Sequence, residues 1–207
     1  MGVTSMRGGD DQARLSGIMQ AFPQIRDGVL VDVGCRRASG QALPPGRNLR
    51  YYGLDRVGTA DILADLAQGL PCVDEGVDIV VALDVLEHVD DIHAAFAEVC
   101  RVASRLVAIT LPNAYELKGR WRFLRGSPLS GKYGLPDEAP PDRHRWIFSL
   151  GEARRFCREC GARCGFAVVA ETCLVGAAGR YGIGERLVAR WPNLLASTYG
   201  VLLQRMQ

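Results

Sequence analysis

Four short apolar runs, each followed at once by a glycine or an aspartate, constrain this chain most. Residues 29–33, 51–54, 62–64 and 77–83 end at Gly34, Asp55, Asp65 and Asp84. Nearly continuous apolar runs of this length are typical of parallel strands that are buried on both faces. Because the carboxyl ends of parallel strands meet at one edge of an open sheet, we expect these four residues to share a ligand site. Capping of the helices that follow is the alternative role for the acids.

The rest of the chain alternates helical and strand patterns. Helices are predicted at 11–22, 91–103 and 149–161, the last with Ser149 as N-cap and Gly161 as its end. Further strands are predicted at 106–111, 166–175 and 198–203, and the first nine residues are expected to be flexible. This alternation predicts an α/β fold, a doubly wound, mostly parallel sheet of seven strands.

Composition limits the class of protein. At 207 residues, 48% hydrophobic and 23% charged, the chain is predicted to form one globular domain over residues 1–207. A net charge of +2 gives no reason to expect a nucleic-acid partner. Seven scattered cysteines favour reduced thiols and a cytoplasmic setting, and no apolar run is long enough to span a bilayer.

Three cysteines in the carboxyl-terminal third could suggest a metal site. Cys157, Cys160 and Cys164 have Cys-x-x-Cys-x-x-x-Cys spacing, with Cys173 further on. A zinc site is one interpretation of such spacing. However, the first two lie on a predicted helix whose apolar face also carries Phe156, and buried cysteine packs as a small hydrophobe. The sequence therefore predicts no metal.

Five successive motifs resemble those of class I S-adenosylmethionine-dependent methyltransferases, of the small-molecule type found in ubiquinone biosynthesis. In order they are Val31-Asp32-Val33-Gly34-Cys35, Gly53-Leu54-Asp55, Ala64-Asp65-Leu66, Asp78-Ile79-Val80-Val81-Ala82-Leu83-Asp84-Val85-Leu86-Glu87-His88-Val89 and Ile109-Thr110-Leu111-Pro112-Asn113. Within them, Leu-Glu-His-Val is the most specific element. The resemblance implies the Rossmann-like methyltransferase fold with an antiparallel edge strand, and S-adenosylmethionine as cofactor.

The resemblance also implies roles for individual residues. Gly34 would lie against the methionine part of the cofactor, and Asp55 would hold the ribose hydroxyls. Asp65 would accept a hydrogen bond from the adenine amino group, with Leu66 beside the ring, and Leu83 would lie near the sulfonium. The implied cofactor-binding set comprises Asp32, Gly34, Asp55, Asp65, Leu66 and Leu83.

One departure from the family pattern concerns the first loop. The family has Gly-x-Gly-x-Gly, whereas Arg36 and Ala38 stand here at the second and third glycines. Glycine permits a positive φ and a close approach of the backbone to the ligand, whereas arginine adopts them only at an energetic cost. Either the loop takes another path, with Gly40 making the turn, or cofactor binding is impaired. A catalytically inactive binding or scaffold protein is therefore the alternative to an enzyme. A nicotinamide-dependent oxidoreductase is a third reading, disfavoured because Gly-x-Gly-x-x-Gly is absent.

The acceptor side is assigned to residues 114–146, read as a helix followed by an ordered excursion. This segment mixes cations with aromatic side chains, which suits a small anionic or sugar-containing acceptor of in-line methyl transfer. A solvated surface segment is the alternative. The candidate acceptor-binding residues are Trp121, Arg143, Arg145 and Trp146. His88 and His144 are the candidate catalytic bases, with structural hydrogen bonding as the alternative role.

Overall fold

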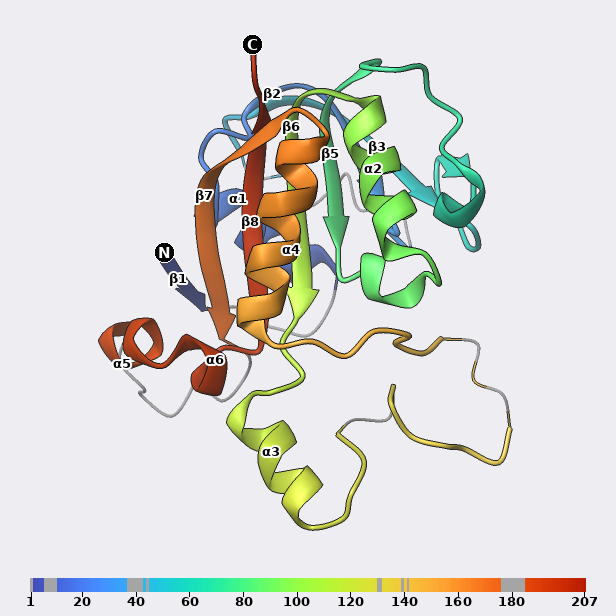
Figure 1. Cartoon of the computed structure of the whole chain (residues 1–207). Helices are drawn as coiled ribbons and strands as arrows, with labels where there is room; N and C mark the ends of the chain where they lie inside the picture. The colour runs from blue at the N-terminus through green and yellow to red at the C-terminus, as the bar shows by residue number, and fades with distance from the viewer. Residues whose placement is uncertain are drawn as a thin grey trace.

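The computed structural model describes residues 2–5, 11–36, 43, 45–129, 132–138, 140, 142–175 and 185–207. Over these residues the chain forms an eight-stranded sheet in the order β1-β7-β8-β6-β5-β2-β3-β4 (Figure 1). Its strands are β1 (Gly2–Ser5), β2 (Asp27–Val33), β3 (Asn48–Asp55), β4 (Ile62–Leu63), β5 (Val77–Leu83), β6 (Ala103–Pro112), β7 (Phe166–Val175) and β8 (Thr198–Arg205). Strand β8 is antiparallel to both β6 and β7, and the other described pairings are parallel.

This sheet confirms the predicted α/β fold and corrects one detail of it. The sheet has eight strands rather than seven, because β1 pairs with β7 from Gly2 opposite Thr172 to Ser5 opposite Val175. The expectation of flexibility is therefore wrong for residues 2–5, while residues 1 and 6–9 lie outside the described residues. The edge of β7 offers unpaired backbone groups that a short extended segment satisfies. A contact between the hydroxyl oxygens of Thr4 and Thr172, 3.0 Å apart, accompanies the pairing.

Helices cover both faces of the sheet (Figure 1). Helix α1 (Asp11–Ala21) buries Leu15, Ile18 and Met19 against one face, together with Phe22, as the helical spacing predicts. Helices α2 (Ile92–Val102) and α4 (Leu150–Arg163) cover the other face, where a larger apolar cluster is buried. The two layers hold the strands rigidly, so that the residues just beyond the strands have defined positions.

The ends of α4 show one correct and one incorrect prediction. Ser149 caps the helix, with a reciprocal capping box to Glu152. Gly161 does not end the helix, which continues to Arg163 and is followed by Gly165 at a φ of +79°. A Cβ at position 161 would lie 3.0 Å from Cδ2 of Leu203, so close packing of the helix on β8 favours glycine there.

The chain leaves the sheet after β6. Helix α3 (Leu117–Leu124) projects below the strands, and the segment that follows returns towards the end of β5 before α4 begins (Figure 1). Helices α5 (Glu185–Arg190) and α6 (Pro192–Leu195) precede β8 and were not predicted. No helix within the described residues is both long and apolar enough to cross a membrane.

Candidate functional site

A pocket of about 600 Å³ lies at the carboxyl ends of the central parallel strands. Its wall includes all four residues singled out by the strand-end pattern: Gly34, Asp55, Asp65 and Asp84. Leu66, His88, Arg143 and Arg145 also line it. The volume falls within the range of about 300–1,000 Å³ that small-molecule sites occupy. The four strand-end residues therefore line one pocket, and its use as a ligand site stays a prediction.

In the loop after β2, the residue at the position of the family's second glycine has a left-handed backbone conformation. Arg36 has a φ of +54°, and its backbone N–H donates to Oδ2 of Asp55 over 2.8 Å. Its guanidinium lies 3.3 Å from Asp142 of the excursion. A Cβ at Gly34 would lie 2.3 Å from Val85, which explains the glycine there. Gly40, the alternative turning point, lies outside the described residues. At Arg36, the backbone thus follows the conformation that favours glycine.

Two aspartates on the pocket wall also hold the local backbone. Asp55 accepts the N–H groups of Arg36 and Val57, one on each carboxylate oxygen. Asp65 accepts the N–H of Ala67 and so caps the short helix η2 (Leu66–Gln68). An ionised carboxylate has about four acceptor positions, so both side chains retain capacity for a ligand.

Two members of the implied cofactor set lie away from the pocket wall. Asp32 is buried within β2 and accepts a hydrogen bond from the hydroxyl of Tyr51 over 2.9 Å. Leu83, the last residue of β5, packs beside the core on the α1 face. Side chains alternate along a strand, so the strand-end argument locates the residues that follow a strand better than those inside it.

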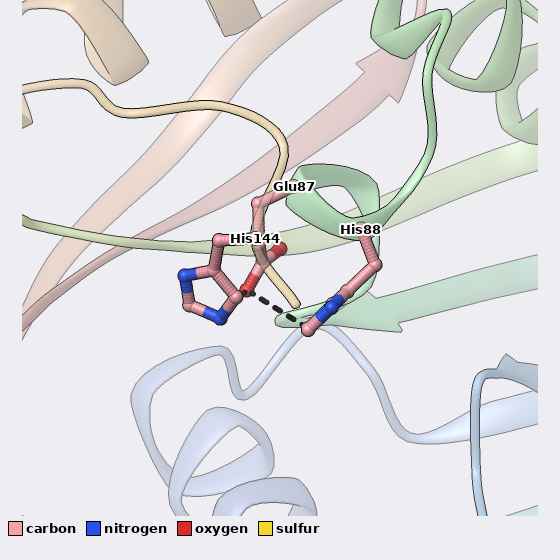
Figure 2. Close-up of side chains that lie close together, drawn as sticks. All are labelled: Glu87, His88 and His144. Atoms are coloured by element: carbon pink, nitrogen blue, oxygen red, sulfur yellow. Dashed lines mark ion pairs between the residues drawn. The ribbon is translucent and has the colours of Figure 1, made fainter. Parts of the chain in front are cut away.

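A compact cluster forms where the turn after β5 meets the excursion (Figure 2). Helix η3 (Leu86–His88) carries Glu87 and His88, and the excursion brings His144 beside them. The imidazole rings of His88 and His144 lie 4.6 Å apart, edge to face. Burial is the main cause that lowers the pKa of both histidines, that of His144 to about 4. Burial also raises the pKa of Glu87 well above its ordinary value. Both imidazoles are therefore neutral at pH 7.

Backbone and side-chain contacts fasten the excursion to this turn. The N–H of Arg145 donates to the carbonyl of Glu87 over 2.8 Å, and its side chain donates to the carbonyl of His88 and pairs with Asp90. The indole N–H of Trp146 donates to the carbonyl of Val89 over 2.9 Å. These contacts place the candidate residues Arg143 and Arg145 at the pocket.

The four candidate acceptor residues therefore do not form one group. Arg143 and Arg145 line the pocket, whereas Trp146 is held against the backbone of the turn. Trp121 lies on the projecting helix α3, is 56% exposed and has the guanidinium of Arg125 over its ring. A mixture of cations and aromatics along the sequence indicates a surface, and it does not indicate which members face the pocket.

Three residues of the site were not singled out from the sequence. Glu87 is fully buried at the centre of the cluster, and the Leu-Glu-His-Val motif contained the signal for it. Asp142 pairs with His88, Arg36 and Lys132, and nothing in its local sequence marks it. Tyr133 lies 2.9 Å from Nδ1 of His144.

The cysteine motif lies in the core rather than at this site. Cys157 and Cys160 are buried on the inner face of α4, as predicted, and all seven cysteines are free thiols. Burial raises the pKa of Cys157 and that of Cys160. Raised pKa values disfavour the thiolate that a metal requires. The absence of zinc there stays a prediction.

Comparisons with known proteins give the chain its context. Residues 31–106 match the family model described as a methyltransferase domain. No curated protein matches. A S-adenosylmethionine-dependent methyltransferase from Archaeoglobus fulgidus is 16% identical, with a TM-score of 0.60 and coverage of 95% of both chains. One from Mesorhizobium loti is 14% identical, with a TM-score of 0.57, covering 95% of this chain and 99% of that one.

The same fold also occurs in a protein that is named as a cyclase and not as a methyltransferase. The [4+2]-cyclase SpnF is 17% identical, with a TM-score of 0.56 and coverage of 99% of this chain and 88% of its own. Fold similarity alone therefore does not assign the reaction, and the residues of the site must carry that argument.

Proposed function

The chain has the fold and the motifs of class I S-adenosylmethionine-dependent methyltransferases, and from this premise we propose that it transfers a methyl group from S-adenosylmethionine to a small acceptor. The observation that carries the proposal is the pocket at the strand ends, with Gly34, Asp55 and Asp65 on its wall. Its volume of about 600 Å³ has room for a nucleoside cofactor together with a small second molecule.

The residues on the wall suit the chemistry of this cofactor. The carboxylates of Asp55 and Asp65 would accept hydrogen bonds from ribose hydroxyls and from the adenine amino group, with Leu66 beside the ring. Arg36 brings a guanidinium to the same wall, and the methionine part of the cofactor ends in a carboxylate. When bound, the cofactor supplies a methyl group activated by positive sulfur. The chain then has to align the acceptor, a contribution of about 7–11 kcal/mol in favourable cases.

We assign the acceptor to the side formed by residues 114–146. Arg143 and Arg145 reach the pocket from this segment, next to His88. Guanidinium groups favour an anionic or sugar-containing acceptor through bidentate hydrogen bonds. His88 and His144 are the candidates for handling the acceptor's proton, since His88 lines the pocket and the ring of His144 lies 4.6 Å from that of His88. The seven free thiols suit the cytoplasm as the compartment.

Cofactor binding by the full chain tests the proposal. Isothermal titration with S-adenosylmethionine should show one binding site. The Asp55→Asn variant should bind the cofactor about 10- to 150-fold more weakly, because it loses about 1.5–3 kcal/mol in charge-assisted hydrogen bonds. Asparagine keeps one acceptor oxygen, so one of the two neighbouring N–H groups loses its partner, and circular dichroism should show that the variant is still folded. Asp27→Asn, at the amino end of β2, is the control and should bind normally.

The alternative is a binding protein that has the fold without methyl transfer. Arg36 in the first loop and the similarity to a cyclase both motivate it. In that case S-adenosylmethionine and S-adenosylhomocysteine would fail to bind, or Asp55→Asn would bind with unchanged affinity. Failure to bind would favour the alternative, whereas unchanged affinity of Asp55→Asn would remove only the ribose role of Asp55.

A further inference from the structure

The inference starts from a buried carboxylate without a hydrogen bond. The side chain of Glu87 has no exposed surface, and neither carboxylate oxygen has a hydrogen-bond partner among the described residues. An isolated buried carboxylate is strongly unfavourable, and proteins pair such groups or use them to coordinate metals.

The hydrogen bonds of the two histidines determine which ring nitrogens carry protons. Nδ1 of His88 faces two acceptors, the carbonyl of Arg143 at 3.0 Å and a carboxylate oxygen of Asp142 at 2.7 Å. Nδ1 of His144 lies 2.9 Å from the hydroxyl of Tyr133, which itself donates to the carbonyl of Trp146. Each Nδ1 therefore carries the hydrogen, and each Nε2 presents a lone pair.

These two nitrogens lie near the same oxygen of the buried carboxylate, and Figure 2 shows the three side chains close together. Nε2 of His88 lies 3.8 Å and Nε2 of His144 lies 3.7 Å from the same Oε1 of Glu87. Both distances exceed that of a hydrogen bond, so a proton is not shared between these atoms. The centre of the cluster therefore presents two ring lone pairs beside a carboxyl group that has no hydrogen-bond partner among the described residues. A cation satisfies such a group.

The spacing suits a single ion. Ligands held about 2.0–2.2 Å from one ion are at most about 4.4 Å apart, and the two measured separations are shorter than this bound. The ligand atoms of Glu87, His88 and His144 all lie within 4.8 Å of one another, so closure of the third separation by a few tenths of an ångström suffices. No other group of three or more potential ligands comes together in the part of the chain that the structure describes.

We propose that Glu87, His88 and His144 bind one divalent first-row transition-metal cation, in the series from Mn²⁺ to Zn²⁺. Two imidazoles and one carboxylate form a donor set that such cations accept with further positions open. Asp142 and Tyr133 supply the outer hydrogen bonds that orient metal-binding histidines. His88 also borders the strand-end pocket, which places the proposed ion next to the pocket.

The metal site limits the chemical class of the acceptor, and this step rests on the proposed function. A cation beside the pocket selects an acceptor with a hydroxyl group, whose pKa it lowers. The hydroxyl proton leaves to water, a bond forms between oxygen and the methyl carbon, and the sulfur keeps the electron pair of the broken carbon–sulfur bond. The products are a methyl ether, S-adenosylhomocysteine and one proton. His88 and His144 then hold the cation instead of taking the proton.

Metal titration of the full chain tests the site directly. Protein stripped with a chelator is titrated with Mn²⁺ and Zn²⁺ by calorimetry, and with Co²⁺ by visible absorption, which separates nitrogen and oxygen ligands from thiolates. Wild type should bind one equivalent. Glu87→Gln and His144→Asn should weaken binding by more than about 100-fold, and Tyr133→Phe by about 10- to 100-fold. His93→Asn, which changes the third histidine of the chain on α2, is the matched control and should bind normally.

Each other outcome has a defined meaning. If stripped wild type binds no ion, or if His93→Asn loses as much affinity as His144→Asn, the site is wrong, and Arg14 and Lys132 are then the charges that favour an ionised Glu87. Ions should also raise the melting temperature of wild type but not that of Glu87→Gln, which keeps the shape of the side chain and so guards against misfolding. Cofactor titration of the same samples separates the two proposals. Ion binding without cofactor binding would overturn the proposed methyl transfer and leave the metal site standing.

Discussion

The left-handed backbone at Arg36 makes a prediction whose sign can be tested. Arg36 is in the first loop at a φ of +54°, where residues with a Cβ are disfavoured by about 1–2 kcal/mol. The comparison is between Arg36→Gly and Arg36→Ala. Both variants lose the same ion pair with Asp142. The side chains of Arg36 and Asp142 are 57% and 37% exposed, and the loss of this exposed pair cancels when the two variants are compared.

What differs between the two variants is strain and entropy. Glycine removes the strain of about 1–2 kcal/mol, but it loses about 0.5–1 kcal/mol more conformational entropy on folding than alanine. The free energy of unfolding of Arg36→Gly should therefore exceed that of Arg36→Ala by about 1 kcal/mol. Were position 36 an ordinary right-handed or extended residue, the order would reverse, with alanine ahead by about 0.5–1 kcal/mol.

Urea unfolding followed by circular dichroism measures this difference. Midpoints at equal slope give the free-energy order directly. An alanine variant more stable than the glycine variant would refute the left-handed loop, and with it our explanation of how an arginine replaces a family glycine. Affinity for S-adenosylmethionine should fall in Arg36→Gly, because the variant loses the guanidinium that we propose to meet the carboxylate of the cofactor.

The remaining predictions concern the excursion, the packing of α4 and the edge of the sheet. Arg145→Ala and Trp146→Ala should retain affinity for S-adenosylmethionine but reduce turnover with a hydroxyl acceptor, and normal turnover in both would place the acceptor elsewhere. Gly161→Ala should lower the free energy of unfolding by about 1 kcal/mol, as overpacking against Leu203 outweighs helix propensity, whereas Gly151→Ala in the same helix should raise it by up to about 1 kcal/mol. Glu171 is partly buried, which raises its pKa, but hydrogen bonds from Arg154 and Tyr199 outweigh this and lower it. Its contribution to stability is therefore present above the ordinary pKa of a glutamate and is lost as the pH falls, so melting curves of Glu171→Gln should vary less with pH below about 4.5 than those of wild type.

The strand ends were predictable because their signature is local. An apolar run followed by an aspartate or a glycine can be recognised within ten residues, and the geometry of a parallel sheet then brings such ends together. This is why Gly34, Asp55, Asp65 and Asp84 were found on one pocket wall. Helix caps such as Ser149 were predictable for the same reason, since the capping box spans four residues.

Contacts between distant segments were not predictable from local patterns. Strand β1 is four residues long and exists because the edge of β7, at Thr172–Val175, accepts it. Gly161 has the local appearance of a helix end, and only the proximity of Leu203 shows that packing favours a glycine there. In both cases the deciding partner lies far away along the chain.

The candidate site divides in the same way. The sequence by itself determined the parallel sheet, the edge at which the pocket opens and the candidacy of His88 and His144, because each depends on residue type and short-range spacing. Only the tertiary structure decided that these histidines meet, since the excursion must return to η3 for their rings to come within 4.6 Å. It also decided that Glu87 is fully buried between them. Burial is a property of the surroundings, and a glutamate in a short motif carries no local sign of it.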